Sequence, residues 1–460
     1  MTRRSFIAGT CATLGSSSLW ATTNTLPPLF SKPLPIPPIL EPKDGVYSLH
    51  VKEGYKRFFS QTLTSTYGVN GDFLGPTMRF KQGEQVRLHV SNALQENVTL
   101  HWHGMEIPGR SDGGPHQEII PNTTWVTGFQ VMQPSSMCWY HPHTMHQTGK
   151  QVYMGIAGLI YIDDPQEEAL PLPRKYGIDD IPVVLQDRRF DTRGEFLYVR
   201  SMHDQMMGLQ GNVLLANGEV QPFVDVSAAP LRLRLLNGSN ARIYQLGFDK
   251  DVTVVQIAGD SSLLPKPVPL RQFYLAPGER VQIVVDLSSY AGENVVLYDG
   301  LSQQPLVQLR VAKGMTKALR LPAELTTIAR YQDTSMLPIR KFELNFQPGR
   351  LAINNKQMNM QRIDETVTLN STEIWEISNP ARMPHPFHIH GTSFKIISRN
   401  GRPPLPNETG LKDTVLVYGG EIVRVAASFH HVANKNNPYM YHCHILEHED
   451  AGMMGQFTVE

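Results

Sequence analysis

Four His-x-His pairs, spread over most of the chain, constrain the fold more than any other feature. In an extended strand, residues two apart point to the same face, so each pair presents two rings roughly 6.6 Å apart. That spacing suits neighbouring metal ions better than a single ion. One pair alone is more often two ordinary surface or core histidines, but four pairs predict that distant segments meet at a metal cluster. The pairs are His101-Trp102-His103, His141-Pro142-His143, His388-Ile389-His390 and His442-Cys443-His444.

The last pair encloses Cys443, whose side chain is expected on the opposite face of the strand, toward His448 and Met453. A thiolate, two imidazoles and a weak thioether form the donor set of a blue-copper electron-transfer site, and the second imidazole has to come from elsewhere. Zinc is the weaker candidate because copper binds more tightly among divalent first-row metals and because zinc is redox-silent. The segment therefore predicts two kinds of copper site next to each other.

Taken together, the motifs resemble the signatures of three-domain bacterial multicopper oxidases of the laccase and copper-efflux-oxidase type, over nearly the whole chain. The signatures are His101-Trp-His-Gly104, Trp139-Tyr-His-Pro-His143, His385-Pro-Phe-His-Ile-His-Gly391 and the run from His442 to Met453. The resemblance implies an all-β fold of three cupredoxin-like Greek-key β-sandwich domains. It also implies four copper ions per chain as cofactors. The implied ligands are His385, Cys443, His448 and axial Met453 for type 1, His101 and His388 for type 2, His103, His141 and His444 for one type 3 ion, and His143, His390 and His442 for the other.

An internal repeat supports three related units. A pair of positions begins nine residues after Asn92, Asn237 and Asn379, and Gly-Glu-x-Val recurs from Gly83, Gly278 and Gly420. The middle unit has Leu246 and Phe248 where its neighbours have histidines, and Pro142 aligns with Cys443. We therefore expect no copper ligands in the middle unit, which would be a spacer and binding wall, and a blue site in the last unit only. The predicted domains are 43–165, 178–313 and 338–460.

The first residues resemble a twin-arginine export signal. Arg3 and Arg4 precede a modest apolar stretch that ends in small residues near Ala21, so residues 1–21 are expected to be removed. The alternative is a disordered, incidentally basic tail. Export implies a periplasmic or otherwise exported protein and makes the twin-arginine machinery a partner. The Pro-rich residues 22–42 would form an extended lead-in.

Composition excludes several function classes. Acidic and basic residues balance at 42 each, without a basic stripe for nucleic acid, and no apolar run reaches the roughly 18 residues of a spanning helix, so stable membrane insertion is not expected. Of three cysteines, Cys11 would leave with the signal and Cys443 would bind copper. Cys138 is left as a buried small hydrophobe, and no disulfide is expected.

Four one-electron metal ions match the four electrons that reduce dioxygen to two waters, which makes dioxygen the expected acceptor. Electrons would enter near an exposed edge of His448 and leave through Cys443 into His442 or His444. By resemblance, Asp112 and Glu449 would supply protons; the alternatives are a turn residue and a loop cap. Glu447 and Asp450 are expected to orient ligands or to face solvent.

Substrate identity is less constrained. Copper-efflux relatives carry a long Met-rich insertion before the last domain, and residues 313–360 contain only four methionines, so we expect no lid and an open site for small phenolic or aromatic donors. Cuprous or another low-valent metal ion stays an alternative donor, bound by Met358, Met360, Met383 and Met440, with Asp413 at a place for a substrate cation. Asn359, where such relatives tend to have an acid, weakens that alternative.

Other function classes remain open. Some proteins with this fold and export signal have lost copper and act as division or envelope scaffolds, but their ligand motifs are eroded, whereas every ligand position is filled in this sequence. Copper nitrite reductase is disfavoured because histidines flank Cys443 on both sides. A copper-storage protein does not need a cysteine ligand flanked by histidine ligands of other copper ions, as Cys443 is by His442 and His444. An oxidase is therefore the function that the sequence favours.

Overall fold

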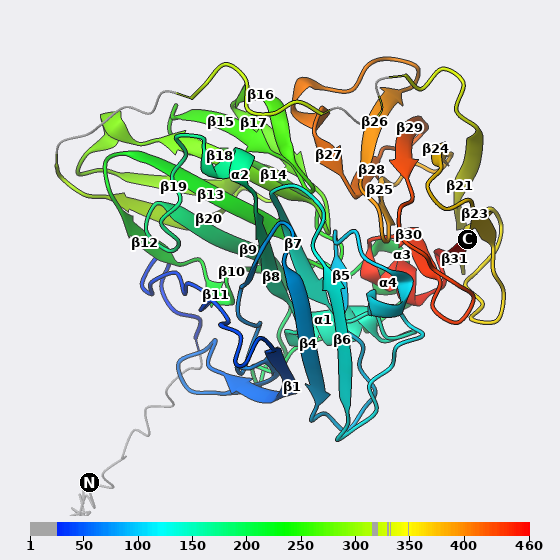
Figure 1. Cartoon of the computed structure of the whole chain (residues 1–460). Coiled ribbons are helices and arrows are strands. Elements are labelled where there is room, and N and C mark those ends of the chain that lie inside the picture. The colour runs from blue at the N-terminus through cyan, green and yellow to red at the C-terminus, as the bar shows by residue number, and fades with distance from the viewer. Residues whose placement is uncertain (1–24, 315–320, 329–330, 332, 348) are drawn as a thin grey trace, which may run out of the picture.

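Strands make up most of the regular structure in the computed structural model, which describes residues 25–314, 321–328, 331, 333–347 and 349–460 (Figure 1). The predicted export signal at 1–21 lies outside the described residues. The strands form six sheets, which pair into three sandwiches along the chain. Each sandwich encloses a core drawn from both of its sheets, because alternate strand residues point inward. The predicted all-β fold class is confirmed, while the division into domains at the stated residues stays a prediction.

The first sandwich packs Val51, Phe80 and Trp102 into its core. One sheet pairs β2 (Thr64–Val69), β1 (Tyr47–Lys56), β4 (Gln85–Asn92) and β6 (Thr124–Gln130) in that order, and the other pairs β3 (Met78–Lys81), β8 (Gly158–Asp163), β7 (Ser136–His141) and β5 (His101–His103).

The second sandwich encloses Leu246 and Phe248, so the positions that hold histidines in the neighbouring units here fill the core. Its larger sheet has the order β11 (Glu219–Val220), β10 (Val213–Ala216), β9 (Asp180–Arg188), β13 (Pro230–Asn237), β18 (Arg280–Asp286), β15 (Thr253–Ala258) and β16 (Leu263–Leu270). Its smaller sheet has the order β12 (Phe223–Val226), β20 (Gln304–Val311), β19 (Asn294–Asp299), β14 (Tyr244–Phe248) and β17 (Gln272–Leu275).

The third sandwich packs Trp375, Phe387 and Phe457 between its sheets. One sheet has the order β22 (Arg350–Ile353), β21 (Ile339–Gln347), β24 (Thr372–Asn379), β29 (Glu421–Ser428), β26 (Phe394–Arg399) and β27 (Leu411–Lys412). The other has the order β23 (Glu365–Val367), β31 (Met454–Val459), β30 (Tyr439–Cys443), β25 (His385–Ile389) and β28 (Thr414–Val417).

Helices are short and lie between strands. None of those in the described part of the chain is long and apolar enough to cross a membrane. In Figure 1 the helices α3 and α4 lie together beside β30, at the junction of the sandwiches. The helices are α1 (Thr148–Met154), α2 (Pro165–Glu168), α3 (Met202–Met207) and α4 (Leu446–Asp450), with 3-10 turns η1 (Gly109–Ser111), η2 (Ser288–Tyr290) and η3 (Pro406–Glu408).

The repeated asparagines have the same role in each sandwich. Each one ends a strand, accepts a hydrogen bond from the backbone N–H two residues on, and donates to two backbone carbonyls. Asn92 bonds Leu94, Glu96 and Ile119 in this way, Asn237 bonds Ser239, Arg242 and Leu275, and Asn379 bonds Ala381, Met383 and Val417. The asparagine therefore fixes the loop that leads into the pair of positions nine residues later.

The Gly-Glu motif is also structural. Its glycines have φ of 87°, 82° and 76°, a conformation that side chains with a Cβ rarely adopt. Each glutamate accepts a hydrogen bond from the backbone N–H three residues earlier, at 2.8 to 2.9 Å. The motif thus marks the same tight turn before a strand in all three sandwiches.

Candidate metal centre

Strand pairing brings the four His-x-His pairs together. In the first sandwich β5 runs antiparallel to β7, which sets His101 opposite His141. In the third, β25 pairs with β30, which sets His388 opposite His442. The eight rings are buried and face one another across the boundary between these two sandwiches. The convergence that the sequence predicted between distant segments is therefore present.

One donor set is formed by Cys443, His385 and His448. The Cys443 Sγ lies 3.4 Å from His385 Nδ1 and 3.7 Å from His448 Nδ1. Burial raises the pKa of the Cys443 thiol and lowers the pKa values of His385 to about 3 and of His448 to about 4. Two neutral imidazoles facing a thiol are the donors that copper binds as a thiolate complex. Met453, the predicted axial ligand, is buried and bonded through its backbone to Cys443 and His448.

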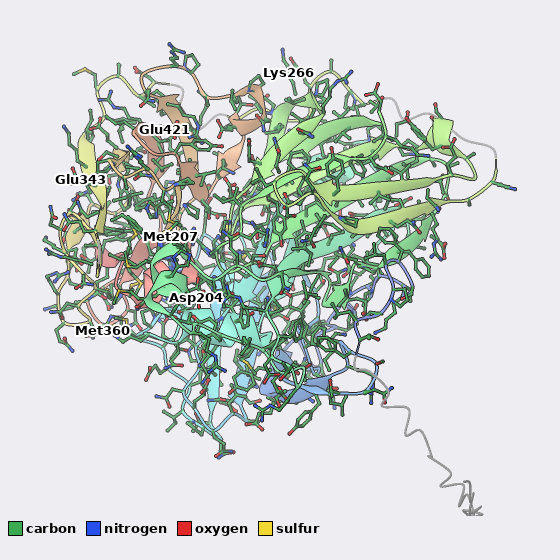
Figure 2. The ribbon with its side chains drawn as sticks, turned by 180° about the vertical axis from the view of Figure 1, so that it is seen from behind. Asp204, Met207, Lys266, Glu343, Met360 and Glu421 are labelled. Atoms are coloured by element: carbon green, nitrogen blue, oxygen red, sulfur yellow. The ribbon has the colours of Figure 1, made fainter. Side chains whose placement is uncertain are left out.

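The expectation that an edge of His448 is exposed is wrong. The ring is fully buried, and its Nε2 donates to the backbone carbonyl of Met206 at 2.8 Å. Met206 belongs to α3, a helix from the middle part of the chain that packs on α4 (Figure 2). The predicted absence of a lid rested on residues 313–360 and did not consider this helix, whose sequence signal is the run Met202, Met206 and Met207.

A second set contains His143, His390 and His442, whose Nε2 atoms converge. His442 Nε2 lies 3.2 Å from both His143 Nε2 and His390 Nε2. Burial lowers the pKa values of His143, to about 4, and of His390, so both rings are neutral near pH 7. The Nδ1 of His390 donates to Asp112 Oδ2 at 2.8 Å, which directs its other nitrogen, as an acceptor, toward the set. Acceptors that face each other without protons favour a bound cation.

A third set contains His103, His141 and His444. The Nδ1 of His103 lies 3.4 Å from His141 Nε2 and 3.3 Å from His444 Nε2. Because the Nε2 of His103 donates to Asp413 at 2.8 Å, its Nδ1 is the free acceptor. These three atoms form the second of the paired sets predicted for the type 3 ions.

His101 and His388, predicted for type 2, have one nitrogen satisfied and one orphaned. Their Nδ1 atoms donate to the backbone carbonyls of Asp112 and Asp413, each at 2.8 Å. Their Nε2 atoms are buried without a hydrogen-bond partner. A buried orphan acceptor is costly unless a ligand satisfies it, so these atoms fit a metal ion. The residues present thus fit copper at all four predicted positions, and the assignment of types remains a prediction.

The two predicted proton donors both contact the histidine sets. Asp112 binds His101 and His390 as described, and its Oδ1 is buried without a partner. The Glu449 carboxylate lies 3.4 Å from His143 Nδ1 and 3.1 Å from His442 Nδ1. Burial alone would raise the pKa of Glu449, but the neighbouring imidazoles outweigh it and lower that pKa to about 2. Their role as proton donors stays a prediction.

Glu447 is buried, so the solvent-facing alternative is wrong for it, while Asp450 is half-buried with its carboxylate hydrogen-bonded. Glu447 accepts hydrogen bonds from Asn240 and the Leu209 N–H, and burial raises its pKa to about 7. Asp450 accepts from the first two N–H groups of α1, Thr148 and Gly149, at 2.9 Å. Both acids therefore bind α4, which carries His448, to other parts of the chain.

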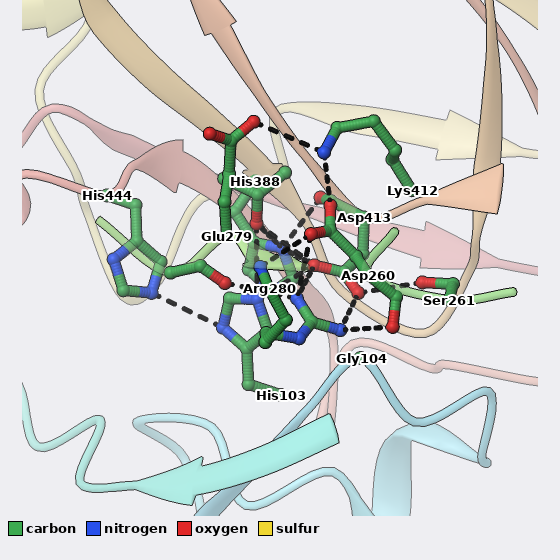
Figure 3. A network of polar contacts seen from close by, with 12 residues as sticks. His103, Gly104, Asp260, Ser261, Glu279, Arg280, His388, Lys412, Asp413 and His444 are labelled. Atoms are coloured by element: carbon green, nitrogen blue, oxygen red, sulfur yellow. Dashed lines mark hydrogen bonds and ion pairs between the residues drawn. The ribbon is translucent and has the colours of Figure 1, made fainter. Parts of the chain in front are cut away.

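Asp413 does not occupy a place for a substrate cation. The side chain is fully buried, accepts hydrogen bonds from Arg280 and Ser261, and binds His103 (Figure 3). Cys138 is buried and free, as predicted, and burial raises the pKa of its thiol to about 12. Gly278 and Arg280 reach the sets from the middle sandwich; the Gly-Glu motif marks this turn in the sequence but gives no sign of what the turn contacts.

Comparisons with known proteins agree with this geometry. Two family models described as multicopper oxidase match residues 50–167 and 322–460. A multicopper oxidase of Staphylococcus haemolyticus is 37% identical over 417 residues, 90% of this chain and 88% of that protein. The chain belongs to the multicopper oxidase family. Its sandwiches are accordingly cupredoxin-like, as predicted.

Solved structures of the family are close in fold. A laccase-like multicopper oxidase from Ochrobactrum sp. is 37% identical with a TM-score of 0.87, over 93% of this chain and 100% of that one. A multicopper oxidase from Pediococcus acidilactici is 35% identical with a TM-score of 0.90, over 95% of this chain and 93% of that one. The family also includes proteins under another name: the cell division protein FtsP of Escherichia coli is 35% identical over 447 residues, 93% of each chain. Family membership alone therefore does not decide between catalysis and another role.

Proposed function

We propose that the protein is a copper-containing oxidase that couples one-electron oxidation of a small donor to reduction of dioxygen to water. The observation that supports it best is the position of Cys443. Its sulfur faces His385 and His448, while its chain neighbours His442 and His444 belong to two other donor sets. A scaffold has no need for three complete sets joined by one residue.

Copper bound in these sets would supply one-electron transfer from the donor and four-electron reduction of dioxygen. The chain's own contribution is to hold the ligands. Cys443 joins the sets by a covalent path of one residue in each direction. Asp112 fixes His101 and His390, and we propose that it and Glu449 relay the protons that water formation consumes, each carboxylate taking up a proton and passing it on.

A phenolic or aromatic molecule is the first candidate donor. The Ochrobactrum protein is described as having oxidase activity towards lignin model compounds and lignosulfonate. In this chain we propose that a bulky donor binds at α3, without entry into the core, and that its electron reaches His448 through the hydrogen bond from His448 to the Met206 carbonyl.

A cuprous ion is the second candidate, and one observation favours it. On α3, Met202 and Met207 are 70% and 41% exposed, and this helix binds His448 through Met206. Thioethers are soft ligands that select cuprous copper. Asp204 of the same helix is buried in contact with Arg189 and is not available to a cation.

Oxygen uptake of the copper-loaded protein tests the proposal. We expect one dioxygen consumed per four electrons from a phenolic donor, without peroxide, and a larger specificity constant for that donor than for cuprous ion. Full copper loading without oxygen uptake from either donor would contradict an oxidase and favour a role like that named for FtsP. Comparable specificity constants would contradict the preference for the organic donor alone.

We also propose export by the twin-arginine route, on the basis of Arg3 and Arg4. Replacing both by lysine keeps the charge and should leave the protein unprocessed in the cytoplasm. A control replacement of Lys32 and Lys43 by arginine, beyond the predicted signal, should have no effect on export. Undiminished export of the double lysine variant would contradict the proposal.

A further inference from the structure

The turn between β17 and β18 brings the middle sandwich against the histidine sets, although it carries no predicted copper ligand. The turn is fixed because the Gly278 N–H donates to the Asn237 carbonyl at 2.9 Å and the Glu279 carboxylate accepts from the Ala276 N–H at 2.8 Å. A Cβ on Gly278 would lie 2.8 Å from Cδ2 of His444, closer than real Cβ atoms come. The backbone of the turn therefore lies directly against a ligand ring.

Arg280, two residues further, is fully buried and joins all three sandwiches (Figure 3). Its Nη1 and Nη2 donate to the two carboxylate oxygens of Asp413 at 2.7 and 2.5 Å, and its Nε donates to the Met137 carbonyl at 2.6 Å. Gly104 leaves room for this pair, since a Cβ there would lie 2.5 Å from the guanidinium. A bidentate pair of this kind fixes direction as well as charge.

Asp413, held in place by Arg280, is hydrogen-bonded to two histidine rings from different sandwiches. Its carboxylate accepts from His103 Nε2, and its backbone carbonyl accepts from His388 Nδ1, each at 2.8 Å. Both bonds select the tautomer that leaves the other ring nitrogen free to face the donor sets. The rings of His103 and His388 stack at 3.7 Å between centroids, so a shift of Asp413 moves both.

The surroundings of Arg280 keep the pair charged. Asp260 accepts from the Arg280 backbone N–H and pairs with Lys412 at 2.9 Å, and Lys412 also pairs with Glu279 at 3.2 Å. Two buried cations thus face three buried carboxylates. Removing Arg280 would leave Asp413 without its cation in a dry interior, which is costly and favours rearrangement.

We propose that this turn of the copper-free middle sandwich is a positioning element for the trinuclear ligands, in which Gly278 holds the ring of His444 and Arg280, through Asp413, holds His103 and His388. The inference rests on the proposed function, since it concerns these histidines as copper ligands. It replaces the expectation that the middle unit is only a spacer and a wall.

Replacement of Arg280 by glutamine tests the arginine. We expect copper at the His101–His388 position to bind about 10–100-fold more weakly, as for loss of an outer hydrogen bond to a ligand. Blue absorption per chain should stay unchanged, because Arg280 does not contact Cys443, His385 or His448. The readouts are copper content after dialysis against graded chelators and the paramagnetic resonance signals of the two mononuclear coppers. Arg280→Lys keeps the charge but cannot donate two parallel hydrogen bonds, so its copper affinity should lie between those of the wild type and Arg280→Gln.

The matched control is Arg232→Gln. Arg232 is also fully buried, in strand β13 next to β18, and its guanidinium bonds Glu167 and Gln282 instead of Asp413. It should retain both kinds of copper. Equal loss of copper in both variants, or loss of blue absorption together with the other sites in Arg280→Gln, would mean general destabilisation and would overturn the proposal.

Replacement of Gly278 by alanine tests the turn, and the repeat supplies its control. Gly420 occupies the same motif position with φ of 76° against 82°, but a Cβ there meets nothing within 4 Å. The two alanine variants therefore carry similar backbone strain, and only Gly278→Ala displaces His444. We expect the near-ultraviolet shoulder of the coupled type 3 pair to be lost in Gly278→Ala and kept in Gly420→Ala. The same spectrum for both would overturn the proposal.

Wild-type protein separates the two levels of inference. If it fails to hold four coppers and to show blue absorption, the proposed function fails. If it holds them and Arg280→Gln keeps its copper with wild-type affinity, only the positioning role fails.

Discussion

The Nε2 atoms of His143 and His442 lie 3.2 Å apart, although 299 residues separate them in the sequence. His143 follows β7 in the first sandwich and His442 lies on β30 in the third, so the contact joins the two ends of the fold. The Nδ1 atoms of both rings face the Glu449 carboxylate, at 3.4 Å for His143 and 3.1 Å for His442, so the two Nε2 atoms are left to face each other. A metal ion between them is therefore the simplest partner for both.

Replacement of Cys443 by serine should remove the blue absorption and lower oxygen uptake by more than the roughly 10–100-fold that loss of a supporting contact costs, because the thiolate itself is lost. Copper at the other sets should remain, since none of them uses the sulfur. Optical spectra and metal content measure this. Cys138→Ser is the control, because Cys138 is equally buried but contacts Gly104 rather than a donor set; loss of colour there as well would point to general misfolding.

Asp112→Asn and Glu449→Gln should each reduce oxygen turnover by about 10²–10⁴-fold, the range for loss of a positioned acid or base. Both changes keep the size of the side chain and remove its ability to hold a proton. Anaerobic reduction of the blue site by the donor should be unaffected, which separates the proton role from donor binding. Glu118→Gln, an exposed acid of the same loop region, is the control. Turnover unchanged across pH in the first two variants would refute the assignment.

Leucine at Met202 and Met207 together should lower the specificity constant for cuprous ion by about tenfold, equivalent to about 1.4 kcal/mol, and leave a phenolic donor within about twofold. The reason is that leucine keeps the apolar volume and removes the soft sulfur. Met336→Leu is the control: Met336 is more exposed still and precedes β21, whose far end carries Phe346 beside His448. Equal losses for both donors would mean that α3 acts only as a steric cover.

Copper-free protein should lose stability on acidification. The pKa values of His385, His448 and His143 are lowered to about 3, 4 and 4 by burial, so between about pH 6.5 and 4 the unfolded chain binds more protons than the folded one. The contribution of these histidines to the free energy of unfolding is fully present above pH 6.5. Below that pH it falls by ~1.4 kcal/mol per pH unit for each such histidine. Copper-loaded protein should decline less, since bound nitrogens take no proton. The melting temperatures of the two forms would be measured from pH 7 to 4, and an equal decline in both forms would contradict this.

Much of the centre could be predicted from the sequence because strand periodicity fixes which rings share a face. That rule predicted the convergence of the four His-x-His pairs and the opposite facing of Cys443, whereas the grouping of the histidines into individual sets came from the resemblance to multicopper oxidases. The middle unit was recognised as free of ligands because Leu246 and Phe248 align with histidines. Each of these features is read from one short segment of the chain.

What the sequence did not reveal depends on contacts between sandwiches. The cover over His448 comes from Met206, 242 positions away, and the partner of Arg280 is Asp413, 133 positions away. Neither contact has a periodic signal, because each is fixed by how whole sheets pack. Asp413 was placed wrongly for the same reason: an acid near metal ligands in sequence can bind a substrate ion or a buried arginine, and only packing distinguishes the two.

The absorption spectrum of the copper-loaded protein, oxidised in air and then reduced without oxygen, tests the proposed oxidase most directly. We expect a strong blue thiolate-to-copper band and a near-ultraviolet shoulder, both bleached on reduction and restored by air. A colourless protein despite full copper loading would contradict copper binding by Cys443 and, with it, the oxidase.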